Sequence, residues 1–141
     1  RSQGFDYNRL ALLVAVLEKR MGLHLEAEDI FVNVAGGIKI EDPAADLAVA
    51  VAIASAFREH LVMPEMVVLG EVGLAGEIRS VSQLVLRINE AQKLGFRHCV
   101  LPRNNYKNLD FKKETLELIP VSTLREALDI IAGSSSGSKG R

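Results

Sequence analysis

The residues that could act as nucleophiles, acid–base catalysts or metal ligands are few and scattered in this sequence. Cys99 is the only cysteine, and no cysteine or histidine stands at the spacing of a metal-ligand pair. Two apolar residues follow Cys99, which indicates a buried, reduced thiol in a cytosolic protein. The three histidines form no cluster: His24, His60 and His98. We therefore expect no metal site, and packing or surface roles for the histidines.

A basic stretch between residues 96 and 113 is interleaved with aromatic side chains. Its members are Arg97, Arg103, Lys107, Lys112 and Lys113, with Phe96, Tyr106 and Phe111. Aromatic rings beside cations can stack on unpaired bases of a nucleic acid. Asp110 and Glu114 dilute the charge, however, and asparagine-rich loops with anchoring aromatics are common. We favour ordinary packing for this stretch.

Composition and charge limit the classes of protein to which the chain can belong. Its 141 residues are 48% hydrophobic and 25% charged, which is typical of one globular domain. The net charge of −1 means that contact with DNA must come from a local patch. The longest apolar run, residues 47–57, is far shorter than the roughly 20 residues of a membrane span. The chain begins with Arg1 and no leader follows, so we expect an excised, cytoplasmic piece of a longer protein.

Periodicity and end signals predict an alternation of helices and strands. Helices are expected over residues 7–21, 43–60, 84–94 and 123–132, each with an apolar face. Strands are expected at 30–34 and 38–40 around a Gly-Gly turn, in a hairpin from 66 to 81, at 99–101 and at 116–121. The helix at 43–60 has almost no polar face and should be buried on most sides. We predict an α/β (α+β) domain over residues 1–132 and a disordered Ser/Gly tail over 133–141.

Long segments of the chain resemble a known family. The order of elements is similar to that of the proteolytic domain of Lon proteases, a fold shared with a domain of ribosomal protein S5. More closely still, three segments resemble the carboxy-terminal domain of the bacterial RadA (Sms) family of RecA-related repair ATPases. They are NRLALLVAVLEKRMGLHL, FVNVAGGIKIEDPAADLAVAVAIAS and LGEVGLAGEIRSVSQLVLRINEAQKLGFRHCVLP. The resemblance implies a Lon-like fold and a role in DNA repair and recombination, including branch migration.

The resemblance also implies that the Lon catalytic dyad is lost. Active Lon opens its buried helix with Gly-Pro-Ser-Ala-Gly, whose serine is the nucleophile, and Ala44 stands at the matching position here. A methyl group cannot form an acyl-enzyme, and loss of such a nucleophile costs roughly 10⁶-fold in turnover. Alignment places Arg87 at the lysine base, and arginine does not give up its proton. Asp46 replaces a glycine and would oppose an oxyanion. We expect no catalytic residue.

Another serine would have to replace the missing nucleophile for any peptidase activity. Ser55 lies three turns into the apolar helix, and Ser80 and Ser82 lie near the end of the hairpin. None of them has a histidine or lysine motif beside it. We interpret Ser55 as a hydroxyl bonded to its own helix and Ser82 as a cap of the next helix. A cryptic serine peptidase with a different nucleophile remains the alternative.

Without catalysis, the domain would work through its surfaces. The resemblance to Lon and RadA implies a hexameric ring. The first hypothesis is therefore a scaffold that keeps a RecA-like ATPase domain of the same protein assembled in a ring. No Gly-x-x-x-x-Gly-Lys-Ser/Thr motif and no cysteine pair occur in the sequence, so we expect neither nucleotide nor zinc, and no other cofactor, to be bound by it.

The second hypothesis is a surface that binds DNA. The candidate residues are Arg9, Lys39, Arg79 and Arg87. The resemblance would place the last three around the former peptidase groove, where an arginine fork suits phosphate oxygens. The alternative is that these cations are solvated or form ion pairs with acidic neighbours, namely Asp42, Asp46 and Glu77.

Overall fold

The computed structural model describes residues 2–25, 32–33, 41–58, 65–107, 109 and 115–136. A parallel sheet of three strands runs through its centre in the order β3 (Met66–Val68), β6 (His98–Pro102), β7 (Glu117–Val121). The predicted strands at 99–101 and 116–121 are therefore confirmed. Parallel neighbours need a crossover connection, and a helix supplies it between β3 and β6.

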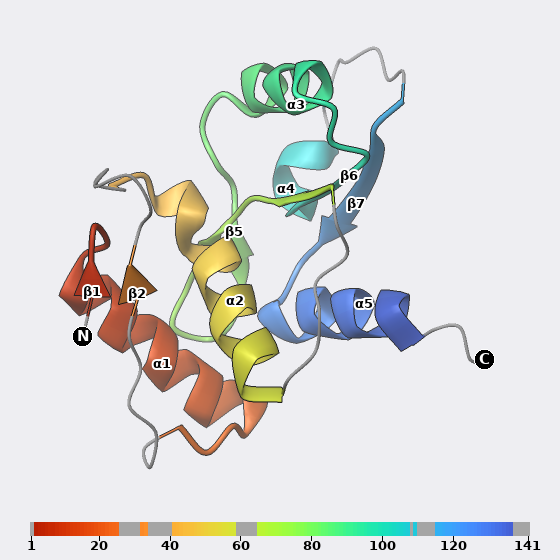
Figure 1. Cartoon of the computed structure of the whole chain (residues 1–141). Helices are drawn as coiled ribbons and strands as arrows, with labels where there is room; N and C mark the ends of the chain where they lie inside the picture. Colours follow the sequence, from red (N-terminus) through yellow and green to blue (C-terminus); the bar gives the residue numbers. More distant parts are fainter. Residues whose placement is uncertain are drawn as a thin grey trace.

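Helices cover both faces of this sheet (Figure 1). α1 (Tyr7–Met21), α2 (Asp46–Arg58) and α5 (Leu124–Ser136) share one apolar core with one face, and α3 (Leu84–Lys93) covers the other. Side chains alternate along β6, so Val100 faces the three helices whereas Cys99 and Leu101 face α3. The α/β class predicted from the sequence is confirmed.

The hairpin predicted from 66 to 81 is confirmed only in part, because residues 66–68, expected in its first arm, form β3 of the parallel sheet instead. β4 (Glu71–Val72) pairs antiparallel with β5 (Ile78–Arg79) around a turn that contains two glycines. β2 (Val32–Asn33) lies within the strand predicted at 30–34, and it pairs in parallel with β1 (Ser2–Gln3), a strand that the sequence did not predict. The predicted Gly-Gly turn and the strand at 38–40 lie outside the described residues.

Helix ends follow the predicted signals. The Asp6 carboxylate accepts a hydrogen bond from the Arg9 amide at 2.9 Å at the start of α1, and Gly22 ends that helix at a φ of 73°. At the start of α5 the Thr123 hydroxyl accepts from the Glu126 amide at 3.0 Å. Residues 103–106 form a single helical turn, α4 (Arg103–Tyr106), at the start of the asparagine-rich stretch.

Two predictions about helix faces are wrong in part. α2 is not buried on most sides, because Ala48, Ala52 and Ala56 are exposed; residues four apart share one face of a helix. Leu94, predicted to belong to the buried stripe of α3, is 69% exposed because α3 ends there and the following Gly95 has a φ of 90°.

Several boundaries stay predictions. α2 is described as far as Arg58, so its predicted end near residue 60 is outside the described part. α5 extends to Ser136, inside the segment 133–141 for which we predict disorder, and the domain boundary at residue 132 is not tested. None of the helices described is both long enough and apolar enough to cross a membrane.

Candidate functional site

The position of the Lon nucleophile lies in a short 3₁₀ turn, η2 (Pro43–Ala45), that leads into α2. The Asp42 carboxylate caps this turn by accepting from the Ala44 amide at 3.0 Å. The Ala44 carbonyl accepts from the Gly70 amide at 3.0 Å, and the Leu47 amide donates to the Gly70 carbonyl at 3.0 Å. Ala44 is 4% exposed and belongs to the apolar cluster under α3. Its backbone is therefore fixed on both sides, and its methyl group is part of the core.

Gly70 allows the strand β3 to pass this close to the start of α2. A Cβ atom at this position would lie 2.7 Å from Cγ2 of Ile78 and 3.3 Å from Cδ2 of Leu47. Only glycine therefore fits between the hairpin and α2 without displacing a neighbour. This close approach holds the turn that carries Ala44 against the sheet.

Arg87, at the position of the Lon base, reaches the same corner from α3. Its Nη2 lies 2.7 Å from Oδ2 of Asp42, and its Nε donates to the Ser82 carbonyl at 2.7 Å. The Ala44 amide holds the pKa of Asp42 below its usual range, and the Arg87 guanidinium adds to this effect. The structure thus brings the two former dyad positions close together. Arg87 forms an ion pair with Asp42, which lies two residues before Ala44.

The prediction that Ser82 caps α3 is wrong. The N-terminal cap of α3 is Gln83, in a left-handed conformation with a φ of 54°, and no side chain caps the helix. Ser82 instead accepts from Arg87 through its carbonyl oxygen and, at 3.4 Å, through its hydroxyl. A φ of this sign is uncommon for a residue other than glycine. No side chain caps the start of α3, and the Ser82 hydroxyl accepts from Arg87 rather than from a helix amide.

Asp46 is fully buried, with 0% exposure, and neutralised by Arg9. The Arg9 fork donates from Nε to Oδ1 at 2.9 Å and from Nη2 to Oδ2, and the Val72 amide donates to Oδ2 at 3.1 Å. The bond to Asp46 raises the pKa of Arg9, so the guanidinium stays charged. A buried charge is tolerated only when it is paired and hydrogen-bonded. The pair joins α1, α2 and β4 beside Ala44.

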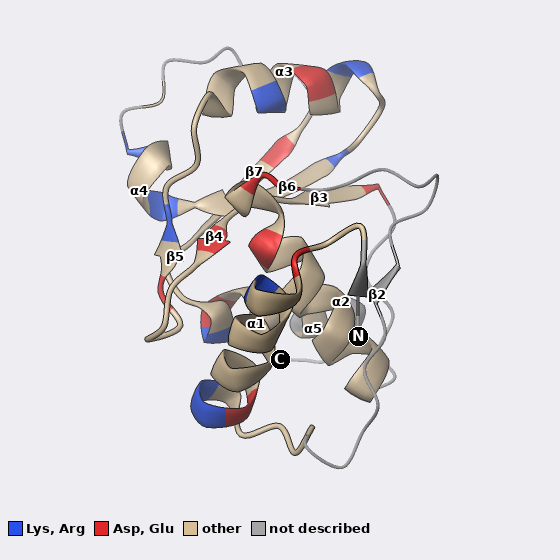
Figure 2. Ribbon diagram, turned by 90° about the vertical axis from the view of Figure 1, so that its left-hand side faces the viewer, with Lys and Arg blue, Asp and Glu red and all other residues tan. Residues whose placement is uncertain are grey.

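Arg79 is paired with Glu77 on the surface of the hairpin. Nη2 of Arg79 lies 3.0 Å from Oε2 of Glu77, and the two side chains are 56% and 42% exposed. The backbone amide of Glu77 lowers the pKa of its carboxyl, and Arg79 lowers it further. In Figure 2 the basic and acidic segments are interspersed around the hairpin and the start of α2.

Three of the four candidate DNA-binding cations, Arg9, Arg79 and Arg87, are therefore held by the acidic neighbours that formed the alternative interpretation. They do not form one cluster of free guanidinium groups. The fourth candidate, Lys39, lies outside the described residues. Whether any of the four contacts DNA stays a prediction.

The second basic stretch is also tied into the fold. Nη2 of Arg103 donates to the Pro120 carbonyl at 3.0 Å and to Oε2 of Glu126 at 2.9 Å. Arg97 lies 3.8 Å from a carboxylate oxygen of Glu65. Tyr106 is 39% exposed, and residues 111–113 are outside the described part.

One structural residue was missed by sequence reasoning. The Asn105 side chain accepts from the Val81 amide at 2.7 Å and donates to the Val81 carbonyl at 3.1 Å. It thus bonds to both backbone groups of Val81, as a paired strand would, and fixes the segment that leads to Arg87. Nothing in the sequence signals a contact across 24 residues.

Cys99 and His98 have the structural roles that we expected. Cys99 is fully buried, and burial raises the pKa of its thiol to about 12, so it is not a nucleophile at neutral pH. Nδ1 of His98 lies 2.8 Å from Oε1 of Glu117 across neighbouring strands. Within the described ranges, no group of three or more His, Cys, Asp or Glu residues is arranged to hold a metal ion.

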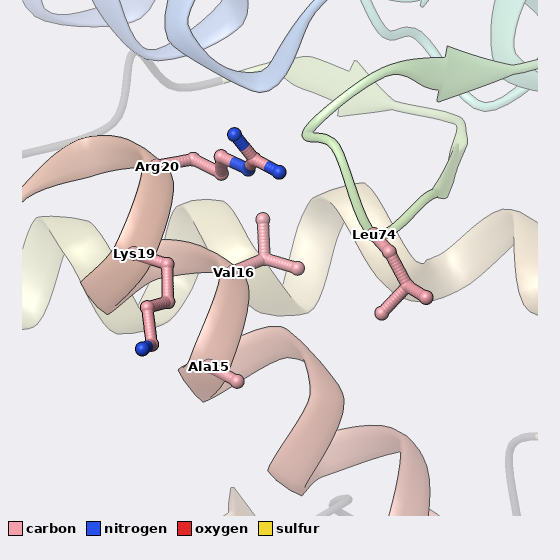
Figure 3. A pocket seen from close by; sticks show the side chains of 5 residues that line it. All are labelled: Ala15, Val16, Lys19, Arg20 and Leu74. Carbon is pink, nitrogen blue, oxygen red and sulfur yellow. The ribbon is translucent and has the colours of Figure 1, made fainter.

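A surface groove lies between α1 and the turn of the β4–β5 hairpin (Figure 3). It is lined by Ala15, Val16, Lys19, Arg20 and Leu74, and its volume is about 370 Å³. Figure 3 shows Arg20 pointing toward the turn that carries Leu74. The groove is on the far side of the sheet from α3.

A family model described as "ChlI: Subunit ChlI of Mg-chelatase" matches residues 11–105, which include the turn at Ala44, the hairpin and Arg87. The chain belongs to this ChlI family. Membership agrees with the predicted Lon-like α/β fold, and it covers both positions of the former dyad.

Curated relatives of this ChlI-family chain carry the name DNA repair protein RadA. The chain is 48% identical over 130 residues to the RadA protein of Halalkalibacterium halodurans, covering 92% of this chain and 28% of the relative. It is 47% identical over 131 residues to that of Aquifex aeolicus, covering 93% and 29%. It is 45% identical over 127 residues to that of a Synechocystis strain, covering 90% and 25%. The resemblance to RadA is confirmed, and the chain spans little more than a quarter of these relatives.

Proposed function

We propose that the chain is a non-catalytic domain of a DNA repair protein, and that it serves as a scaffold for ring assembly. The observation that carries this proposal is the closed corner at the start of α2. Ala44 is buried with both backbone groups bonded, Arg87 is bound to Asp42, and Arg9 is bound to Asp46. The groups that would have to act as nucleophile and base are thus absent or engaged in the fold.

The proposed assembly is a ring, expected to be a hexamer, in which this domain aligns RecA-like ATPase domains of a longer protein. The chain is similar to little more than a quarter of the length of each RadA relative, which supports a role as one part of such a protein. The proposed role is cytoplasmic and requires no cofactor bound to the chain itself.

Multi-angle light scattering after size exclusion tests the scaffold role. A mass that rises with concentration toward a defined multiple of one chain is the expected result. A strict monomer at several hundred micromolar would contradict the proposal, because the isolated scaffold must retain some self-affinity.

A second candidate function is accessory DNA binding, and Arg79 is the residue that favours it. Its ion pair with Glu77 is exposed, and such pairs contribute only about 0–1 kcal/mol, so a phosphate can replace the carboxylate at little cost. Arg9, by contrast, neutralises a fully buried carboxylate and is not free to leave it.

DNA affinity measured against salt concentration distinguishes these residues. If Arg79 contacts a phosphate, Arg79→Ala should reduce the slope of log affinity against log salt by about one unit. Lys93→Ala, which removes an exposed cation in the last turn of α3, is the matched control. An unchanged slope for Arg79→Ala would remove it from the DNA-binding surface.

A further inference from the structure

Three leucines of the described part are strongly exposed: Leu74 at 70%, Leu94 at 69% and Leu86 at 59%. Single exposed leucines are ordinary on protein surfaces, but these three fall into two small patches. Leu74 lies at the groove between α1 and the hairpin, and Leu86 and Leu94 lie on α3. Each patch also contains charge of one sign that lacks an ion pair within the described residues.

The first patch is the hairpin groove, lined by the five residues shown in Figure 3. Val16 is 2% exposed and contributes an apolar floor. Lys19 and Arg20 line the same groove, and in the described part of the chain neither forms an ion pair. A dry cavity of about 150 Å³ holds a benzene molecule. At about 370 Å³ the groove has room for more than one aliphatic side chain.

The hairpin groove is held in shape by bonds to α5. The Leu124 amide donates to the Gly76 carbonyl at 2.7 Å, which anchors the turn of the hairpin to the start of that helix. Arg125 donates from Nη2 to the Arg20 carbonyl at 2.8 Å, which anchors the end of α1 to the same helix. A preformed groove loses little entropy when it is filled.

The second patch is the α3 ridge, defined by Leu86, Glu90 and Leu94. These residues recur at intervals of four, so they lie along one face of the helix and its end, and the two leucines are about 12 Å apart along the axis. Glu90 is exposed, and no ion pair to it is found among the described residues. The ridge is thus a carboxylate between two exposed leucines.

We propose that the α3 ridge of one copy of this chain seats in the hairpin groove of the next copy. Leu86 and Leu94 would pack against Leu74 and Val16, and Glu90 would lie beside Lys19 and Arg20. This inference rests on the proposed self-association and names the two surfaces that carry it.

The two patches lie on opposite sides of the sheet, with α3 above it and α1 below it in both Figure 1 and Figure 2. A contact between two different patches of identical chains is head to tail and repeats from copy to copy, closing into a ring when the rotation allows. A two-fold dimer, in contrast, joins a patch to itself. The arrangement therefore fits a ring rather than a symmetric dimer.

A second copy fits the groove better than nucleic acid does. A DNA backbone would use Lys19 and Arg20 but would leave the exposed apolar surface of Leu74 without a partner. The α3 ridge supplies both the apolar side chains and the opposite charge, and every copy of the chain carries it. Charge complementarity of this kind fixes register and orientation between partners.

Sedimentation velocity over a concentration series tests this interface by charge exchange. We expect Glu90→Lys and the pair Lys19→Glu/Arg20→Glu each to weaken association by at least tenfold. Combining the three substitutions should recover most of that loss, because the charges are then exchanged rather than opposed. Leu74→Ser should weaken association by a further, independent tenfold or more. Circular dichroism confirms that each variant is folded.

Two matched controls separate the interface from general effects. Lys107→Glu changes net charge by the same sign and amount as each Lys19 or Arg20 reversal, at the exposed residue that follows α4, and should leave association unchanged. Tyr7→Ser removes an apolar side chain that is 65% exposed at the opposite end of α1 and should also have no effect.

The outcomes distinguish this inference from the scaffold proposal. Self-association that persists in all the variants, or losses that the combined variant does not recover, would overturn the interface while leaving the scaffold intact. A chain that is monomeric before any substitution would overturn the scaffold itself. Loss of DNA affinity without loss of association in Lys19→Glu/Arg20→Glu would assign the groove to nucleic acid instead.

Discussion

The corner around Ala44 and the two outer patches use charge in opposite ways. At the corner, Arg9 and Arg87 are bonded to Asp46 and Asp42, and the surrounding backbone groups are bonded as well. At the hairpin groove and the α3 ridge, charged groups stand beside exposed leucines without ion pairs among the described residues. Paired charges stabilise the chain itself, whereas unpaired charges beside apolar surface are available to a partner. Disrupting the corner should therefore reduce stability, and disrupting the patches should reduce association.

The largest effect on stability is expected from Arg9→Met. This change leaves the carboxylate of Asp46 buried, with the Val72 amide as its remaining partner among the described residues. Removing one partner of a buried pair costs 3–5 kcal/mol, and we expect about 3 kcal/mol because Arg9 is partly in water. Urea denaturation measures the loss.

The double variant Arg9→Met/Asp46→Leu is the control for this prediction. It removes both charges, so it should recover most of the lost stability. If the single variant unfolded at the same urea concentration as the unchanged chain, Arg9 would not be part of the closed corner.

The next largest effect is expected from Gly70→Ala. The new Cβ would lie 2.7 Å from Ile78 and would push the hairpin away from α2. Overpacking of this kind costs about 2 kcal/mol, which thermal unfolding would detect. Gly22→Ala is a useful contrast, since there the cost comes from a φ of 73° and not from contact with any neighbour. A Gly70→Ala chain as stable as the original would show that the strand does not need this close approach.

Ala44→Ser tests the former catalytic position directly. The hydroxyl would enter an apolar cluster, and we expect a loss of about 1 kcal/mol with no gain of activity, because Arg87 is bonded to Asp42 and cannot act as a base. Incubation with a fluorophosphonate that labels activated serines measures the outcome. Labelling of the variant would mean that the corner still activates a nucleophile, and labelling of the unchanged chain would favour the cryptic peptidase.

The smallest effect concerns pH. The pKa of Asp42 is lowered below its ordinary 3.8 in the folded chain, so its charge stabilises the fold at higher pH. That contribution is lost as the pH falls through the folded pKa. Asparagine keeps the helix cap but not the charge, so Asp42→Asn should cost about 0.5 kcal/mol at pH 6. The difference from the unchanged chain should disappear in urea titrations as the pH falls through the lowered pKa of Asp42. A difference independent of pH would exclude the ion pair as its source.

Local signals predicted much of the fold. The side chains of Asp6 and Thr123 accept hydrogen bonds from backbone amides three residues later, and so mark helix starts. Gly22 marks a helix end because it adopts a positive φ there and its amide donates to the Leu17 carbonyl. The strand at 99–101 follows from a short apolar run ended by proline, and the second arm of the hairpin follows from the alternation of polar and apolar residues after Gly76. Such signals act within one turn or one strand, and the sequence displays them directly.

The remaining features depend on contacts between distant segments. The Ser82 prediction was wrong because a carbonyl bond to Arg87 and the left-handed Gln83 decide its orientation. The hydrogen bond between Asn105 and Val81 joins residues 24 positions apart, and no local sequence pattern predicts it. For the candidate cations, the sequence offered both a DNA-binding and an ion-pair interpretation, and only the fold shows which acid lies beside each guanidinium.

The measurement that tests the account most directly is the mass of the unchanged chain by sedimentation equilibrium, from low micromolar to several hundred micromolar. A chain that works through its surfaces should shift reversibly from one copy toward a single larger assembly as concentration rises, and Glu90→Lys should move that shift to higher concentration. A mass that stays at one copy over the whole range would contradict the account.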